Sequence, residues 1–397
     1  MNSSEKHKPR LVVVLSRFPF PTEKGDKLRA FYQIRDLSKD WDIYAICLSE
    51  QTISEEHKAK VNAYCKELHI FQLDKWKKLF NTGLQFFTTK PFQVGYFYQH
   101  SIHHQIDILL KRIEPDHIFC QLIRAAEYVK NYHSCTKTID YMDALSAGIK
   151  RRIPQSSLLS RWLFRSEWKR LTRYENILFD YFEYHTIISE QDRDLIAHPQ
   201  RAKIDILPNG VGEHFFNYSK PVQKTHDLVF TGNLSYPPNI NAVHYITHEI
   251  CPVLKASGRN VSVLISGANP VSEIERLQGK IDLTGWVEDI RDSYAKGIVF
   301  VAPMFIGTGL QNKLLEAMAM GIPCITTPLA NNALGADSSS ILLAETPEGF
   351  ADKIQMLLSD EELRERYATN GQNYVKANFN WNNLTQKLSD KMMAISR

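Results

Sequence analysis

The chain has 397 residues, of which 43% are hydrophobic and 23% are charged. These values exclude a disordered chain, and the length suggests two domains of about 200 residues each. The net charge of +4 is uneven, because residues 1–208 carry 32 Lys and Arg against 25 Asp and Glu while residues 209–397 carry 16 against 19. The first half is therefore expected to meet an anionic partner.

Strand-like apolar runs alternate with helix-like segments through the first half. A helix is expected near 26–38, and the runs lie at 11–16, 42–48, 67–73, 116–122, 136–142 and 184–190. After the turn-rich stretch 207–215 the alternation restarts with runs at 227–232, 261–267, 280–286, 297–303 and 323–327. This pattern predicts an α/β protein with two doubly wound parallel-sheet domains of the Rossmann-like type, facing a central cleft at the carboxyl ends of their strands.

The predicted boundaries are 1–208 for the first domain, 209–375 for the second and 376–397 for a C-terminal amphipathic helix. No apolar run approaches the ~20 residues of a membrane span, and 11–15 is too short for the core of a signal peptide. A cytoplasmic protein is the resulting expectation. The 6 cysteines form no CxxC pair and the 14 histidines show no ligand spacing, so neither a disulfide framework nor a metal site is predicted.

Residues 148–173 combine many cations with aromatic side chains. Glu167 is the single acid there, whereas the cations are Lys150, Arg151, Arg152, Arg161, Arg165, Lys169, Arg170 and Arg173. Trp162 and Trp168 lie among them. Residues 75–80, KWKKLF, again combine lysines with aromatic side chains. The pattern suits peripheral contact with an anionic membrane. The alternative is a helix with its aromatics in the core and its charges in water. No nucleic-acid motif accompanies the charge, so no nucleic-acid partner is predicted.

Residues 297–327 read as strand, glycine turn, helix and strand. The amide groups of Gly309, Leu310 and Gln311 are predicted to open the helix, where the macrodipole favours phosphate, and Glu316 could reach a hydroxyl group beside it. Two structural alternatives stand beside this hypothesis. Thr308 and Gln311 have the spacing of a capping box, and Lys313 and Glu316 have the spacing of a surface ion pair.

The stretch Glu316–Pro323, EAMAMGIP, resembles the nucleotide-sugar signature of retaining GT-B glycosyltransferases of family 4. The resemblance implies a GT-B fold whose last helix returns to the first domain. It also implies that Glu316 binds the donor ribose and that Gly309, Leu310 and Gln311 hold the diphosphate. The donor would be a nucleotide diphosphate-sugar, UDP-sugar rather than GDP-sugar, with no cofactor or metal. The segment FPFPTEKGDKLRA, residues 18–30, resembles a segment of the sugar transferases that are associated with exosortase and exopolysaccharide systems.

The sequence departs from this family at three places. Thr308 stands where the family usually has an acid, Asn233 stands where many members have an arginine, and Pro237 and Pro238 occupy the region of a lysine. Departure of a diphosphate needs a cation. Lys313 is the predicted replacement.

Arg29 or Arg124 is expected to contribute positive charge from the first domain. The resemblance also places Gly25, Lys27 and Arg29 near the reacting centre. For Lys27 and Arg29 the alternative is a solvated helix start.

Two further loops complete the predicted site. The resemblance assigns Val287 to a loop that lines the nucleobase, and Trp286 beside it is expected to pack rather than stack on the base. Asp140 and Asp143 close a strand of the first domain. One or both could bind an acceptor, or Asp143 could serve a turn.

The residues themselves predict a diphosphate and ribose site, and the resemblance implies a retaining, hexosyltransferase-type glycosyltransferase in polysaccharide or glycoconjugate biosynthesis. The expected location is the cytoplasm, at the inner face of the cell membrane. Its acceptor would be a glycan, a lipid-linked sugar or a small molecule. No obvious carboxylate pair is seen, which agrees with front-face attack in which the leaving phosphate takes the acceptor's proton. Two alternatives remain: a non-catalytic nucleotide-sugar-binding subunit of a polysaccharide assembly complex, and a GT-B sugar-nucleotide epimerase.

Overall fold

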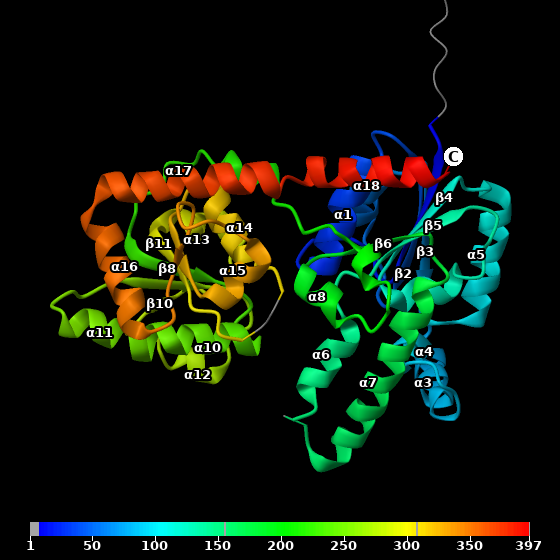
Figure 1. Ribbon diagram of the computed structural model, residues 1–397, viewed down its shortest axis with the longest axis horizontal. Helices are drawn as coiled ribbons and strands as arrows, with labels where there is room; N and C mark the ends of the chain where they lie inside the picture. Colours follow the sequence, from blue (N-terminus) through cyan, green and yellow to red (C-terminus); the bar gives the residue numbers. More distant parts are fainter. Residues whose placement is uncertain (1–7, 155, 307–308, 397) are drawn as a thin grey trace, which may run out of the picture. The chain divides into compact units, whose positions relative to one another are not determined.

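The computed structural model describes residues 8–154, 156–306 and 309–396. The chain divides into two compact units, one made of Met1–Pro208 with Trp381–Arg397 and the other of Asn209–Asn380. Figure 1 shows that each unit has its own sheet with helices packed around it.

Among the described residues of the first unit, seven parallel strands form one sheet in the order β3-β2-β1-β4-β5-β6-β7. Val13 of the central strand pairs with Ala45 of β2 on one side and with Phe119 of β4 on the other. The bounds are β1 Arg10–Leu15, β2 Asp42–Ser49, β3 Glu67–Gln72, β4 His117–Gln121, β5 Thr136–Asp140, β6 Tyr184–Ile187 and β7 Asp205–Ile206.

Helices cover both faces of this sheet, and β1 shows why. Val12 and Val14 belong to one buried cluster, whereas Leu11, Val13 and Leu15 belong to another, because successive strand residues point to opposite faces. The helices are α1 Gly25–Leu37, α2 Glu55–Asn62, α3 Lys75–Leu84, α4 Phe92–Phe97, α5 His100–Ile113, α6 Leu145–Arg152, α7 Leu158–Phe179, α8 Glu190–Leu195 and α18 Trp381–Ser396. Short 3-10 helices are η1 Gln85–Phe87, η2 Ile123–Tyr128 and η3 Arg201–Lys203.

The C-terminal helix α18 packs on the first unit, as predicted. Leu384, Leu388 and Met392 recur every fourth residue, so they share one helix face, and they join the cluster that contains Leu11. The ring of Trp381 stacks on Tyr32 of α1 with centroids 5.2 Å apart. Figure 1 shows α18 next to α1.

Within the described part of the second unit, six parallel strands take the order β10-β9-β8-β11-β12-β13. The strands are β8 His226–Thr231, β9 Val263–Ser266, β10 Asp282–Leu283, β11 Gly297–Ala302, β12 Cys324–Thr326 and β13 Leu342–Leu343. The helices are α9 Glu213–Phe216, α10 Pro237–Tyr245, α11 Cys251–Ala256, α12 Ser272–Glu275, α13 Ile290–Lys296, α14 Asn312–Ala319, α15 Pro328–Leu334, α16 Pro347–Ser359 and α17 Glu361–Asn378, with a π-helical turn η4 at Ile246–Ile250.

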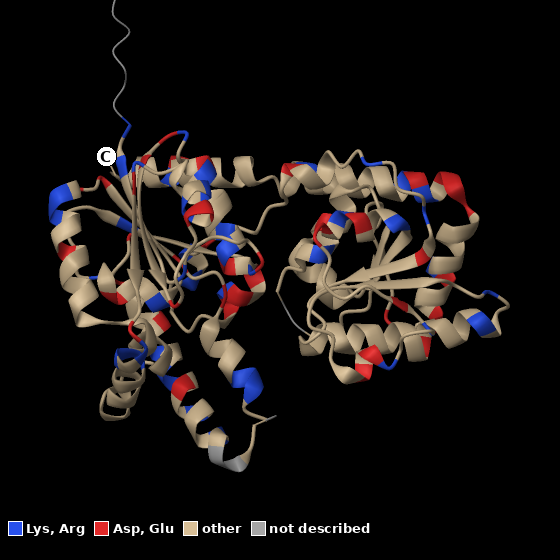
Figure 2. Cartoon of the chain, turned by 180° about the vertical axis from the view of Figure 1, so that it is seen from behind, with Lys and Arg blue, Asp and Glu red and all other residues tan. Residues whose placement is uncertain are grey.

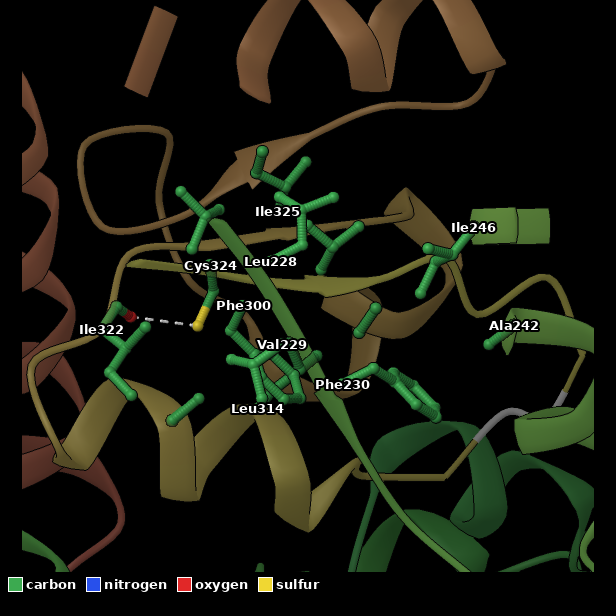
Figure 3. Close-up of a cluster of buried hydrophobic side chains, with 14 of the residues drawn as sticks. Leu228, Val229, Phe230, Ala242, Ile246, Phe300, Leu314, Ile322, Cys324 and Ile325 are labelled. Atoms are coloured by element: carbon green, nitrogen blue, oxygen red, sulfur yellow. Dashed lines mark hydrogen bonds between the residues drawn. The ribbon is translucent and has the colours of Figure 1, made fainter. Parts of the chain in front are cut away.

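The core of the second unit fixes α14 against the sheet. Figure 3 shows Leu314 of α14 near Val229 of β8 and Phe300 of β11, and Leu314 is fully buried. The thiol of Cys324 donates to the carbonyl oxygen of Ile322 at 3.2 Å, at the start of β12. Because one side of α14 is anchored in this way, the position of its polar side is also set.

Both units confirm the predicted doubly wound architecture. Strand order reverses between β1 and β4 in the first sheet and between β8 and β11 in the second. In open α/β sheets, ligands bind outside the carboxyl ends of the strands at such a reversal. Across the described ranges, no helix combines the length and the apolar character needed to traverse a bilayer.

Candidate functional site

Three loops at the carboxyl edge of the second sheet are joined by backbone hydrogen bonds. The N–H of Gly232, after β8, donates to the carbonyl oxygen of Ser266 at 3.0 Å, and the N–H of Gly267 donates to that of Gly285 at 3.0 Å. A Cβ on Gly267 would lie only 1.7 Å from the carbonyl oxygen of Gly232. Glycine is therefore required at position 267 for the two loops to approach.

Glu316, on α14, is oriented by Tyr294 of α13. The Tyr294 hydroxyl donates to Oε2 of Glu316 at 2.8 Å and accepts a hydrogen bond from Thr231 at 2.7 Å. Tyr294 is fully buried, whereas Glu316 is half-buried. Oε1 of Glu316 accepts no hydrogen bond from the described residues. One carboxylate oxygen is thus fixed, and the other can accept a ligand hydroxyl.

Lys313, one turn earlier on α14, is held by neutral groups. Its ammonium group donates to Oδ1 of Asn239 and lies 4.8 Å from the ring centroid of Phe230. Asn239 is itself oriented, because its Nδ2 donates to the carbonyl oxygen of Asn233 at 2.8 Å. The predicted alternative of a surface ion pair with Glu316 is wrong. Lys313 bonds to an amide, and Glu316 bonds to a phenol.

The surroundings shift the pKa values of both side chains. Packing of protein atoms around the half-buried ammonium lowers the pKa of Lys313 to about 7, an effect that nearby Glu316 opposes. Desolvation likewise raises the pKa of Glu316 to about 7, opposed by the Tyr294 hydrogen bond and by Lys313. A bound anion would favour the charged ammonium, so this lysine is suited to receive one.

The start of α14 differs from the prediction. Asn312 is the first helical residue, and Gln311 is the N-cap with φ −92° and ψ 96°, without a side-chain cap. Gly309, Leu310 and Gln311 therefore lie in the preceding loop, because the extended Gln311 backbone delays the first helical turn. The side chain of Gln311 does not make the reciprocal bond of a capping box, since its amide donates to the carbonyl oxygen of Gly309 at 3.0 Å. Thr308 lies outside the described residues.

The remaining donor-side candidates lie in loops of the same unit. Asn233 is exposed, and its Oδ1 closes a local turn by accepting the N–H of Ser235 at 3.0 Å. Val287 is half-buried between β10 and α13. Trp286 beside it is 68% exposed, so the expectation that it packs is wrong.

Arg29 has a different environment from the predicted one. Its guanidinium group is fully buried and forms an ion pair with Asp140 at 2.6 Å. Thr186 also donates to Asp140, at 3.0 Å. This enclosure contradicts the solvated helix start for Arg29 and argues against Arg29 as a catalytic cation. A neutralised, enclosed guanidinium group is unable to stabilise a leaving group.

The other first-unit candidates share the carboxyl edge of their sheet. Gly25 begins α1 after β1, and Lys27 is half-buried on its first turn, where desolvation lowers the pKa of its ammonium group. Arg124, in η2 after β4, is half-buried and donates to Oε1 of Gln93 at 2.7 Å. Asp143 follows β5 and is exposed. In contrast to Asp140, Asp143 can reach a ligand.

Sequence reasoning missed Asn239, Tyr294 and Thr231. Tyr294 lies in a short helix where periodicity indicates only a core position, and Asn239 follows two prolines that read as a helix start. All three residues are far from α14 in the sequence, so no local pattern connects them with Lys313 or Glu316. Among the described residues, no group of three or more His, Cys, Asp or Glu could hold a metal ion.

Comparison with known proteins adds a family match to this geometry. Residues 225–360 match the family described as glycosyl transferases group 1. A protein of Klebsiella pneumoniae, described as an uncharacterized 44.6 kDa protein in the cps region, is 22% identical, with 93% of this chain and 96% of that one covered. CapM of Staphylococcus aureus, a capsular polysaccharide biosynthesis glycosyltransferase, is 29% identical over 33% of this chain and 38% of its own.

A solved structure resembles the whole chain. HepE of Anabaena, crystallised with UDP, gives a TM-score of 0.65 at 12% identity, with 97% of this chain and 100% of that chain covered. At this identity the likeness establishes the fold. The two Rossmann-like sheets and the match of residues 225–360 to group 1 glycosyl transferases together support a GT-B glycosyltransferase.

Proposed function

We propose that this protein transfers a sugar from a nucleotide diphosphate-sugar to an acceptor hydroxyl in polysaccharide or glycoconjugate biosynthesis, with retention of configuration. Residues 209–375 form the donor domain, and residues 1–208 form the acceptor-side domain. The observation that carries the proposal is the pair of polar side chains on α14. Lys313 is held by an amide and Glu316 by a phenol, and both stand at the reversal of strand order in the second sheet.

Glu316 binds the ribose of the donor. Tyr294 fixes Oε2, which directs Oε1 to accept a hydrogen bond from a ribose hydroxyl. The diphosphate lies beside Lys313 and the start of α14, where the helix dipole also favours negative charge. The loop residues Gly309, Leu310 and Gln311, together with Thr308, Asn233 and Val287, complete the donor site.

Lys313 acts on the leaving group. As the bond between the sugar and the diphosphate breaks, negative charge grows on the β-phosphate, and the ammonium group stabilises it. The departing phosphate oxygen then takes the proton of the attacking acceptor hydroxyl on the same face of the sugar, which retains the anomeric configuration. Gly25, Lys27, Arg124 and the exposed Asp143 bind the acceptor.

The relatives support this class of substrate. The Klebsiella protein is encoded in a cps region, and CapM is a capsular polysaccharide biosynthesis glycosyltransferase. HepE has been crystallised with UDP and with UDP-glucose. We therefore propose a UDP-sugar, rather than a GDP-sugar, as the donor, and a hexosyl group as the sugar transferred.

A non-catalytic sugar-nucleotide-binding subunit is the second candidate. The exposed Asn233 and the helix-starting Pro237 and Pro238 favour it, because the family places cations in this region. Binding alone would not distinguish it from an enzyme, so turnover must be measured.

The test begins with calorimetric titration of the full chain with UDP, GDP and ADP. One of the three should bind, and we expect it to be UDP. The corresponding nucleotide-sugars should then release the free nucleotide when sugar glycosides are supplied as acceptors. NMR of the product reports whether configuration is retained. Failure of all three nucleotides to bind would overturn the proposal. Binding without release would favour the non-catalytic subunit, and isomerised donor without release would indicate an epimerase.

A further inference from the structure

Helix α3 presents its polar side to the protein and its apolar side to solvent. Lys78 is buried, and its ammonium group donates to Glu50 at 2.5 Å and to the hydroxyl of Tyr96 at 3.0 Å. Asn81 donates to the carbonyl oxygen of Tyr98 at 2.6 Å. Amphipathic helices of globular proteins normally have the reverse orientation. The exposed side of α3 is thus left without a protein partner among the described residues.

The exposed side continues into η1 and onto α7. On α3 and η1, large apolar side chains recur at helical spacing, and the ring of Phe86 stacks on Trp162 of α7 with centroids 6.3 Å apart. We call this the α3–α7 surface. Its exposed apolar residues are Trp76 (80%), Leu79 (64%), Phe80 (67%), Leu84 (43%), Phe86 (50%), Phe87 (89%), Trp162 (64%) and Leu163 (38%).

Hydrogen bonds hold the two parts of this surface together. Arg170 of α7 donates through Nη1 to the carbonyl oxygens of Gln85 at 2.6 Å, Thr88 at 2.5 Å and Lys90 at 2.9 Å. Segments about 80 residues apart in the sequence are therefore fixed side by side. The alternative in which the aromatics of 148–173 lie in the core is wrong for Trp162, whereas Phe164 and Trp168 do pack on the core.

The exposed charges on α6 and α7 up to Arg173 are positive. The one acid of this stretch, Glu167, is buried and accepts the N–H groups of Phe92 at 2.7 Å and Gln93 at 3.1 Å. Figure 2 shows blue Lys and Arg segments along α6 and α7. The exposed cations of α3, α6 and α7 are Lys75, Lys77, Lys150, Arg151, Arg152, Arg165, Lys169 and Arg173.

We propose that the α3–α7 surface binds the face of an anionic lipid bilayer, with the aromatic rings inserted at headgroup level and the cations against lipid phosphates. Trp and Phe side chains partition favourably into the interface of a bilayer, and each Lys or Arg near an anionic membrane surface strengthens binding. A second copy of the chain fits less well. A symmetric contact would bring two copies of the same cation-bearing surface together. This inference is independent of the proposed sugar transfer.

The test is co-sedimentation of the full chain with vesicles of phosphatidylcholine alone or mixed with phosphatidylglycerol. The protein should bind the mixed vesicles and dissociate as salt rises. Replacing exposed rings with Trp76→Ser, Phe80→Ser and Phe87→Ser, or exposed cations with Arg165→Glu and Lys169→Glu, should each lower the partition coefficient by about tenfold or more. These rings make no stacking contact within the described residues, so the fold should tolerate their loss.

Matched controls come from α5 of the same unit. Ile108 is 54% exposed and Lys111 is exposed, so Ile108→Ser and Lys111→Glu should leave binding unchanged. Circular dichroism confirms that each variant is folded. Equal binding to both vesicle types, no binding to either, or equal loss in the α5 controls would overturn the proposal. Concentration-dependent self-association that the ring substitutions abolish, without lipid binding, would assign the surface to a second copy instead.

Discussion

Arg29 in the first unit and Lys313 in the second are both cations on a helix that follows a strand at the reversal of strand order. Arg29 lies on α1 after β1, and Lys313 lies on α14 after β11. Arg29 is enclosed and neutralised by Asp140, with 0% of either side chain exposed. Lys313 is half-buried, and its partner is the neutral amide of Asn239. A cation paired with a buried carboxylate is already neutralised, whereas a cation held by a neutral group can still pair with an anionic ligand.

The largest effect on stability should follow from breaking the Arg29 pair. Arg29→Met leaves the Asp140 carboxylate buried without its cation, so the free energy of unfolding should fall by about 3–5 kcal/mol. Adding Asp140→Asn removes the stranded charge and should recover part of that loss. Chemical denaturation followed by circular dichroism measures both. A cost below about 1 kcal/mol for Arg29→Met would contradict a structural role for this pair.

For Lys313 the same kind of substitution should affect chemistry instead of folding. Lys313→Ala removes the cation that faces the leaving diphosphate, so turnover should fall by about 100- to 1000-fold while the unfolding transition stays in place. Lys280→Ala, at an exposed position of the same unit, serves as the control. An unchanged rate in the Lys313 variant would show that leaving-group stabilisation comes from another residue.

The charge on Lys313 should make nucleotide binding depend on pH. Desolvation lowers the pKa of Lys313 to about 7 in the free protein, so its positive charge is present below pH 7 and is lost above it. Affinity for UDP should therefore decline as pH rises from 7 to 9, by up to about tenfold per pH unit. Lys313→Arg keeps its charge over this range and should flatten the profile. A wild-type profile that rises with pH would contradict the sign.

The smallest effect concerns Trp286. Because its ring is 68% exposed, Trp286→Ala should change the free energy of unfolding by less than about 0.5 kcal/mol. Phe300→Ala, in the core of the same unit, should cost about 3–5 kcal/mol. Thermal unfolding of the two variants checks this difference. A large loss for Trp286→Ala would restore the packing role that the sequence suggested.

Long apolar runs made the fold predictable from sequence. Buried central strands such as β1 and β11 are continuous hydrophobic segments, which alternation with helices assigns to parallel sheets. The two-residue edge strands β7 and β13 carry too little pattern to predict. Glu316 and Lys313 could be identified because a motif surrounds them. The roles of their partners Tyr294 and Asn239 depend on contacts between segments, which no local pattern encodes.

The proposed donor site requires Glu316 to hold the ribose, and calorimetry with UDP and 2′,3′-dideoxy-UDP tests this role. Wild-type protein should bind UDP about tenfold or more tightly, because the dideoxy ligand leaves the carboxylate without its hydroxyl partners. In Glu316→Leu the two ligands should bind equally, while Tyr294 retains the Lys313 carbonyl oxygen as an acceptor at 3.3 Å. Equal affinities in the wild-type protein would contradict ribose binding by Glu316.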